Sequence, residues 1–209
     1  MTNHFQLSTL LTTLIVMLFV LQAEAADFPG VNTSALSAND KNAPIGFGAA
    51  VTGSGDENPV TVTTLNGLKE ALAGTDKKTI YVSGSITFSG MVSIDGASNK
   101  TVYGLPGATL ANTTLDTSDK NKSGILTLKN CNNIVLRNLT FLGAGAYDYD
   151  GYDNLTLTTC TNIWVDHCDF QDGVDGNLDC NQRVGQHLRL MVPLPLSEGG
   201  YSRWQRRFQ

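Results

Sequence analysis

The sequence predicts an all-β protein, an incomplete parallel β-helix with one short N-terminal helix, and three observations support this. After Gly74, short runs of alternating or β-branched residues follow one another, separated by Gly, Asn, Asp or Ser, without helical periodicity. The run from Cys131 to Phe141 aligns without gaps on the run from Cys160 to Phe170, at one constant offset. Each run holds one Asn, one apolar strand and one turn, which is typical of a coil that must stack on its neighbours to bury its apolar face.

The helix is predicted between Thr64 and Ala73, because leucines recur at helical spacing, Thr64 is a suitable N-cap and Gly74 a suitable stop. A strand is also predicted around Trp164. The remaining strands are predicted at Val60–Thr63, Thr79–Ser83, Ser85–Phe88, Met91–Ile94, Lys100–Tyr103, Gly124–Leu128, Ile134–Arg137 and Leu155–Thr158.

Stacking of the two aligned runs places like residues side by side. Asn133 is expected next to Asn162, about one strand spacing away, as part of a hydrogen-bonded ladder. Cys131 is expected next to Cys160, either as a disulfide or as two buried thiols, and the specific geometry that a disulfide requires favours thiols. The four cysteines form no Cys-x-x-Cys pair, so no zinc site is expected.

Length and charge restrict the partners. The 209 residues suit one domain, and the formal net charge of −5 argues against a nucleic-acid partner, which requires a basic face. A protein of this charge can still bind an acidic ligand when a divalent cation bridges the two.

Residues 1–25 are predicted to be a secretory signal peptide. The run from Leu10 to Leu21 is apolar and too short for a comfortable membrane span, and Ala23-Glu24-Ala25 has the form of a cleavage site. Because the segment before Leu10 lacks Lys and Arg, a buried helix or an uncleaved anchor is the alternative. We expect a secreted protein, extracellular or periplasmic, without membrane contact after cleavage.

Three acids are candidate metal ligands. Asp175 and Asp179 lie four residues apart, separated by small and turn-forming residues. Asp153 precedes the Leu155–Thr158 strand. Carboxylates that converge from neighbouring turns provide the oxygen ligands that Ca²⁺ needs. The alternative is that these acids are solvated turn formers.

Several motifs, in the same order along the chain, resemble those of one family. The stretch Trp164–His167 reads Trp-Val-Asp-His and resembles the Trp-Ile-Asp-His signature of pectate lyases of polysaccharide lyase family 1. Further resemblance to that family's N-terminal segment and coils covers Gly46–Gly48, Val60–Leu72, Val82–Ile86, Asn99–Gly104 and Asn133–Leu139.

The resemblance implies a right-handed parallel β-helix of the pectin lyase-like kind that cleaves polygalacturonate by Ca²⁺-dependent β-elimination, as a monomer. By position, Asp153, Asp175 and Asp179 match Ca²⁺ ligands of the family. Asp150 is an additional candidate in a supporting place, although the family has a nearby acid one position closer to Asp153, where this chain has Gly151.

The same resemblance implies that Trp164, Asp166 and His167 support the fold and do not react. A lone His beside a coil core is also, on physical grounds, more often part of a satisfied network than a base. In the family the base is an Arg on coils that follow the acid pair.

The pattern changes after Cys180, so residues 26–180 are predicted to be the lyase part and residues 181–209 a tail foreign to the family. Five of the six arginines lie in this tail, Thr and Lys are absent from it, and its prolines do not suit a coil. Read one nucleotide further on, the codons for Met191-Val192 encode Trp, and the codons around them permit the next coil of the repeat. We therefore hypothesise that a frameshift after Cys180 produced this tail and that the chain is a truncated lyase. None of the tail's arginines matches the family's Arg motif, so no base is assigned and weak or no activity is expected.

Two other functions remain open. A pectin lyase acts on methylated polymer without Ca²⁺, and the three acids argue against it. A non-catalytic β-helix would only bind polysaccharide, and the missing Arg favours it for this chain, because a fold does not fix a function.

Overall fold

The computed structural model of the chain describes residues 50–55, 59–147, 149–181 and 188–191. The predicted signal peptide and most of the predicted tail lie outside these residues. Within the described part of the chain, no helix is both long and apolar enough to cross a membrane.

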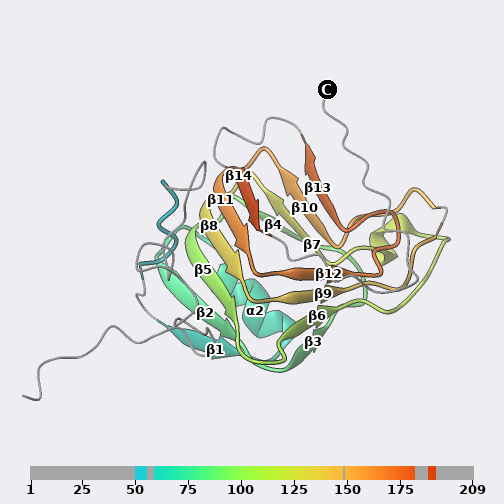
Figure 1. The fold of residues 1–209 in the computed structure, drawn as a ribbon, viewed down its shortest axis with the longest axis horizontal. Coiled ribbons are helices and arrows are strands. Elements are labelled where there is room, and N and C mark those ends of the chain that lie inside the picture. Colours follow the sequence, from blue (N-terminus) through green and yellow to red (C-terminus); the bar gives the residue numbers. More distant parts are fainter. Residues whose placement is uncertain (1–49, 56–58, 148, 182–187, 192–209) are drawn as a thin grey trace, which may run out of the picture. The chain divides into compact units, whose positions relative to one another are not determined.

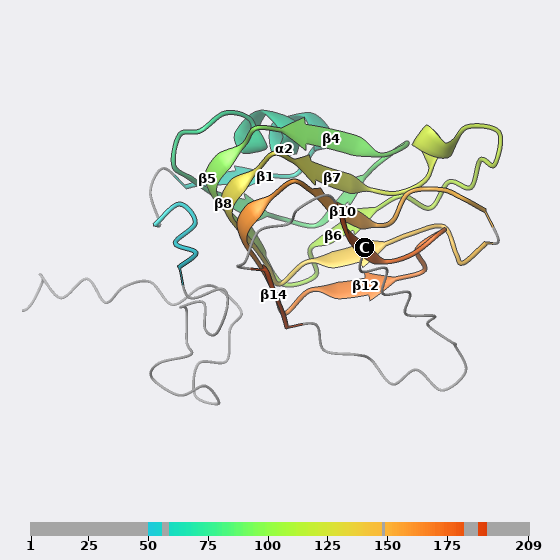
Figure 2. The same cartoon turned by 90° about the horizontal axis from the view of Figure 1, so that it is seen from above.

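Three parallel sheets, each built from one strand per coil, make up the fold (Figure 1). Sheet A has the order β1 (Val60–Val62), β2 (Lys78–Val82), β5 (Ser98–Gly104), β8 (Asn132–Arg137), β11 (Thr161–Asp166) and β14 (Leu188–Met191). Sheet B has the order β12 (Asp169–Gln171), β9 (Thr140–Leu142), β6 (Thr109–Ala111) and β3 (Ser85–Thr87). Sheet C has the order β13 (Leu178–Asn181), β10 (Leu155–Thr158), β7 (Leu126–Lys129) and β4 (Val92–Asp95). Figure 2 shows the coils stacked in chain order, from β1, α2 and β4 at the top to β12 and β14 at the bottom. The predicted parallel β-helix is confirmed.

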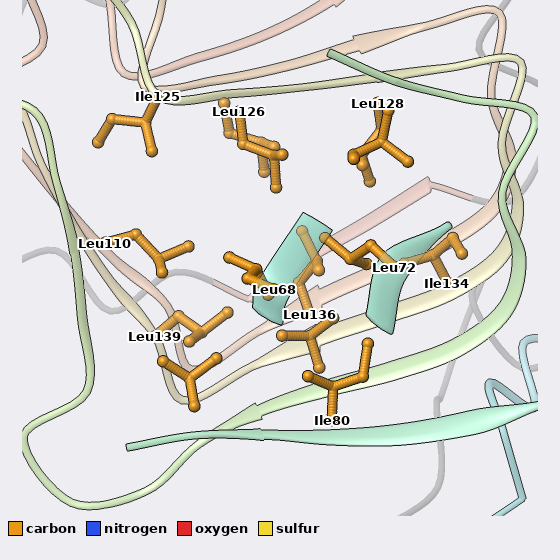
Figure 3. Packing of buried hydrophobic residues seen from close by; sticks show 14 of the residues in the cluster. Leu68, Leu72, Ile80, Leu110, Ile125, Leu126, Leu128, Ile134, Leu136 and Leu139 are labelled. Carbon is orange, nitrogen blue, oxygen red and sulfur yellow. The ribbon is translucent and has the colours of Figure 1, made fainter. Parts of the chain in front are cut away.

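The core forms because alternate residues of each strand point inward and stack on their equivalents in the next coil. Ile134 and Leu136 of β8 pair with Ile163 and Val165 of β11, and all four are fully buried. Figure 3 shows leucines and isoleucines from several coils meeting in this interior. Each coil therefore supplies a layer that the next coil covers.

The predicted helix is confirmed as α2 (Leu65–Leu72). The Thr64 hydroxyl accepts a hydrogen bond from the Gly67 N–H, and Gly74 beyond the C-cap has a φ of 72°. The side chains of Leu68 and Leu72 are buried in the same core as the strands (Figure 3).

The coils differ in length, although their strands stay in register. In sheet C, Val92 of β4 pairs with Leu126 of β7, Leu126 pairs with Leu155 of β10, and Leu155 pairs with Leu178 of β13. The stretch of chain between successive partners shortens at each of these steps. Most of the change is in the loops between sheets B and C, which we call the B–C corner, and the rest is in strand β5 and the loop after it, both longer than their counterparts in the next coil. The B–C corner comprises residues 88–91, 112–125, 143–154 and 172–177.

Asn133 and Asn162 lie at equivalent positions of the paired strands β8 and β11, as predicted, but the predicted hydrogen bond between them is not found in the described part of the chain. Asn99, Asn133 and Asn162 share a left-handed backbone, with φ of 57°, 58° and 54°, and the Asn133 amide nitrogen lies 2.8 Å from the Asn99 amide oxygen. Asn133 makes no hydrogen bond to Asn162 within the described residues. Its amide oxygen instead accepts hydrogen bonds from the backbone N–H groups of Thr52 and Gly53, at 2.8 and 2.9 Å.

The cysteines are free thiols in the described structure, as favoured from the sequence. Cys131, Cys160 and Cys168 are buried and Cys180 is half-buried. Burial is the main cause that raises the pKa of the Cys168 and Cys180 thiols, to about 12 in each case.

The strands β6, β9 and β12 of sheet B were not predicted from the sequence, and neither was any strand within the predicted tail. Within the predicted tail, Leu188–Met191 forms β14, which pairs in parallel with β11 in the register Ile163–Leu188 and Val165–Leu190. A short strand needs only a neighbouring strand whose backbone groups it can pair, so the loss of the longer coil motif did not preclude it.

Candidate functional site

The backbone of the B–C corner brings Asp153 and Asp175 onto neighbouring segments. The Asn154 N–H donates to the Gly176 carbonyl at 3.2 Å, and the Leu155 N–H donates to the Asn177 carbonyl at 3.1 Å. These two bonds begin the pairing of β10 with β13, so the loop that carries Asp175 runs beside the residues around Asp153.

Asp179 belongs to the strand that follows this loop. In the pairing of β10 with β13, Thr156 stands opposite Asp179, between the inward-facing pairs Leu155–Leu178 and Leu157–Cys180. Because successive side chains alternate, Asp179 points outward from sheet C. Its carboxylate accepts a hydrogen bond from the Asn181 amide at 3.0 Å.

The three acids interact electrostatically. Burial, followed by the negative charges of Asp179 and Asp175, raises the pKa of Asp153 to about 7. A partly buried carboxyl repelled by two others favours either a proton or a bound cation. The structure therefore unites the three acids that the sequence singled out as candidate ligands.

A small residue maintains this arrangement. A Cβ atom on Gly176 would lie 2.4 Å from the Asp153 Oδ1, which is closer than non-bonded atoms approach. Any larger residue at this position would therefore displace the carboxylate. Below it, the Asn154 amide nitrogen donates to the Gln171 carbonyl at 2.8 Å and to the Asn177 Oδ1 at 3.0 Å. These amides hold the loop that carries Asp175. Sequence analysis did not single out Asn154 or Asn177 for this role.

The donor set suits a hard cation, since carboxylate oxygens are the ligands that Ca²⁺ prefers. In the described residues, however, no three side chains of His, Cys, Asp or Glu already converge as the ligands of one ion. Ca²⁺ binding would thus require the carboxylates to rotate toward a common point. Asp175 is exposed, so burial does not restrain such a rotation of its side chain.

Asp150, the additional candidate, is not among the charges that raise the pKa of Asp153. It is exposed on the loop before Asp153, and the charges that raise the pKa of Asp153 come from Asp179 and Asp175. At the neighbouring position, a Cβ on Gly151 would lie 2.6 Å from the Ser123 hydroxyl, so this segment packs tightly on the previous coil.

Trp164, Asp166 and His167 form a second cluster, on β11 and its C-terminal end. The Oδ2 atom of the buried Asp166 lies 2.9 Å from the Arg137 Nε and 2.8 Å from the His167 Nδ1. The Arg137 guanidinium lies 5.4 Å from the Trp164 ring centroid, and Trp164 packs on Val135. Sequence analysis missed Arg137, although the repeat places it opposite Asp166.

The two clusters lie at different corners of the coil. His167 follows β11 at the turn between sheets A and B, whereas Asp153 and Asp175 lie between sheets B and C (Figure 1). The buried ion pair and the three acids are therefore separate features of the fold.

A fold of stacked coils that form three parallel sheets defines the class of parallel β-helix proteins, and comparison with known proteins gives the family. A family model described as pectate lyase matches residues 7–185. The chain belongs to the pectate lyase family.

Relatives agree with this assignment. A probable pectate lyase B of Aspergillus terreus is 35% identical over 150 residues, covering 66% of this chain and 41% of the relative. A pectate trisaccharide-lyase of Thermotoga maritima is 29% identical over 166 residues, covering 73% of this chain and 42% of the relative. The chain thus spans about two fifths of the length of these relatives.

Solved structures agree on the fold. A pectate lyase from Paenibacillus sp. 0602 superposes with a TM-score of 0.57 at 16% identity, over 70% of this chain and 40% of that one. The fold is the predicted right-handed parallel β-helix, present here in part.

Proposed function

We propose that the chain carries the Ca²⁺-binding acids of a secreted lyase that cleaves polygalacturonate by β-elimination. The observation that supports this most is the placing of Asp153 and Asp175 in the B–C corner with Asp179 on the strand that follows, so that one partly buried carboxyl is held against the charge of the other two. Such a concentration of negative charge on an already acidic protein suits a divalent cation, which in turn suits an acidic polymer.

Each acid has a distinct part in the proposal. Asp153 would supply the least exposed oxygen ligand, kept in place by the backbone bonds of Asn154 and Leu155 to the adjoining loop. Asp179 would supply an oxygen from the rigid strand β13, and Asp175 one from the exposed loop. When bound, the ion would supply an electrophile that stabilises negative charge developing on the substrate carboxylate.

The proton α to that carboxylate must be removed by a base, and the proposal assigns none to this chain. The family resemblance places an arginine base on coils after the acid pair, and no residue of the stretch from Arg183 to Arg207 matches its motif. The buried Arg137 is engaged by Asp166 on sheet A and is therefore a supporting residue. Within the proposal, the arrangement of Trp164, Asp166 and His167 likewise supports sheet A.

Two experiments test the proposal. In the first, absorbance of unsaturated uronate released from polygalacturonate is measured with Ca²⁺ and with chelator, for the chain as given and for a version whose frame is restored after Cys180. We expect activity only in the restored version with Ca²⁺. Activity in the chain as given would mean that the tail supplies a base, and activity unaffected by chelator would contradict the metal.

In the second, calcium binding is tested directly by calorimetry on the chain as given. Asp179→Ala removes one ligand and should weaken Ca²⁺ binding by roughly tenfold or more, since one charge-assisted contact contributes on the order of 1.5–3 kcal/mol. Glu70→Ala, on exposed α2, is the matched loss of one carboxylate and should leave the affinity unchanged. Equal affinities in the two variants would show that Asp179 is not a ligand.

A further inference from the structure

A lysine from the previous coil lies over the ring of the tyrosine that directly precedes Asp153. The short 3₁₀ helix η3 (Lys120–Lys122) belongs to the B–C corner before β7, one coil N-terminal to Asp153. The Lys120 ammonium lies 5.7 Å from the centroid of the Tyr152 ring, and Tyr152 directly precedes Asp153. The ammonium is thus held by the ring of Tyr152, one residue before Asp153 in the chain.

The backbone around Lys120 is anchored to the segment that carries the acid. The Tyr152 N–H donates to the Ser123 hydroxyl at 2.8 Å, and that hydroxyl donates to the Lys120 carbonyl at 2.6 Å. A Cβ on Gly124 would lie 2.6 Å from the Tyr152 Cβ, so the two segments touch directly.

The other side of the same turn is also fixed. The buried Asn112 amide donates to the carbonyls of Lys122 and Gly124, at 2.8 and 2.7 Å. Lys120 is therefore an exposed side chain on a turn that is tied down at both ends.

The two lysines of η3 differ in their partners. Lys122 lies 3.9 Å from the Asp116 carboxylate, which neutralises part of its charge. For Lys120, the described residues provide no carboxylate within ion-pair distance, and its recorded contact is the ring of Tyr152. Of the two lysines of η3, Lys120 is therefore the one available to pair with an anionic ligand.

We infer that Lys120, oriented by the Tyr152 ring, is a subsite for the carboxylate of a galacturonate unit adjacent to the unit bound at the three acids. This inference rests on the proposed function. Lys120, Asp153 and Asp179 come from three consecutive coils, whose strands β7, β10 and β13 pair in register about one strand spacing apart. A polymer with one carboxylate per sugar would meet the metal at one coil and an available cation at the next.

The charge pattern explains why a cation is needed there. The acids repel further carboxylates of the same polymer that lie beyond the reach of the metal, and the Lys120 ammonium on the preceding coil would attract one of them. Tyr152 is a positioning residue, because its ring holds the ammonium and does not itself carry charge.

The test measures binding of a galacturonate trimer to the full chain by calorimetry, in saturating Ca²⁺. Lys120→Gln should weaken trimer binding roughly three- to fivefold, the effect expected of one exposed ion pair. Lys69→Gln, on exposed α2, removes the same charge elsewhere and should leave the affinity unchanged. Tyr152→Leu should weaken binding as Lys120→Gln does, whereas Tyr152→Phe, which keeps the ring, should not.

Two further readouts separate the subsite from the metal site. The Ca²⁺ affinity without trimer should be the same in Lys120→Gln and wild type, and the methyl-esterified trimer should bind both proteins equally. Equal binding of the free trimer by Lys120→Gln and Lys69→Gln would overturn the subsite alone. Failure of the wild-type chain to bind the trimer in Ca²⁺ would overturn the proposed function, and the subsite with it.

Discussion

Two aspartates on the same stack of coils have opposite surroundings. Asp166 is buried on the outer side of sheet A, where Arg137 and His167 both contact its carboxylate. Asp153 is partly buried at the B–C corner, where its charged neighbours are the acids Asp175 and Asp179. The first site is complete within the protein, whereas the second leaves negative charge for a ligand to neutralise. Charge compensation, more than residue type, thus distinguishes the supporting Asp166 from Asp153, which we propose binds an ion.

The largest expected effect comes from breaking the compensated site. Arg137→Met removes the guanidinium from the buried Asp166 carboxylate and should cost about 3–5 kcal/mol of unfolding free energy, because it leaves a buried charge without its partner. Urea unfolding monitored by circular dichroism measures this. Replacing both partners, as Arg137→Met with Asp166→Leu, should recover much of the loss. A single variant as stable as wild type would show that the pair does not stabilise sheet A.

The stability that Asp153 contributes should change with pH in the opposite direction to that of a carboxylate held in an ion pair. The pKa of Asp153, about 7 when folded, lies above its unfolded value, so the folded state binds the proton more tightly. The resulting stability is fully present below about pH 4 and is lost as the pH rises through 7. In chelator, this group should make the protein about 1–2 kcal/mol less stable at pH 8 than at pH 5, after allowing for solvent screening.

Asp153→Asn isolates that contribution, because an amide does not titrate. The melting temperature in chelator should fall less between pH 5 and pH 8 in this variant than in wild type, and the variant should be the more stable protein at pH 8. Identical pH profiles would mean that the charge at Asp153 is already neutralised within the protein.

The smallest expected effect on the free energy of unfolding is at His167, the exposed residue that contacts Asp166. His167 contacts Asp166 but is 46% exposed, and its φ of 48° lies in the left-handed region. His167→Asn, which tolerates this backbone, should cost only about 0.5 kcal/mol, because Arg137 still neutralises the buried carboxylate. Urea unfolding checks this. A loss as large as that of Arg137→Met would make His167 the main partner.

The sequence predicted sheets A and C far better than sheet B. Strands such as β8 and β11 are six residues long, contain three consecutive apolar residues and belong to aligned copies of one motif. The strands β6, β9 and β12 have three residues each, which is too short for alternation to be recognised, and their pairing depends on coils that are far apart in sequence.

The candidate site was predicted in part for a similar reason. Asp153, Asp175 and Asp179 were recognisable because they flank strands of the repeat. Arg137 was overlooked because a charged residue in a strand is ordinarily solvent-exposed, whereas here the partners Asp166 and Trp164 cover it. Lys120 and Tyr152 belong to different coils, and only the folded loops of the B–C corner bring them together.

The unequal coil lengths have a consequence for how such a protein can change over evolution. Sheet C keeps its register while the B–C corner takes loops of quite different size, so insertions and deletions there leave the stack intact. The same corner bears Asp153, Asp175 and Lys120. A lineage can therefore lengthen or trim the loops that carry the proposed ligand residues, while the apolar interior that holds the coils together is inherited unchanged.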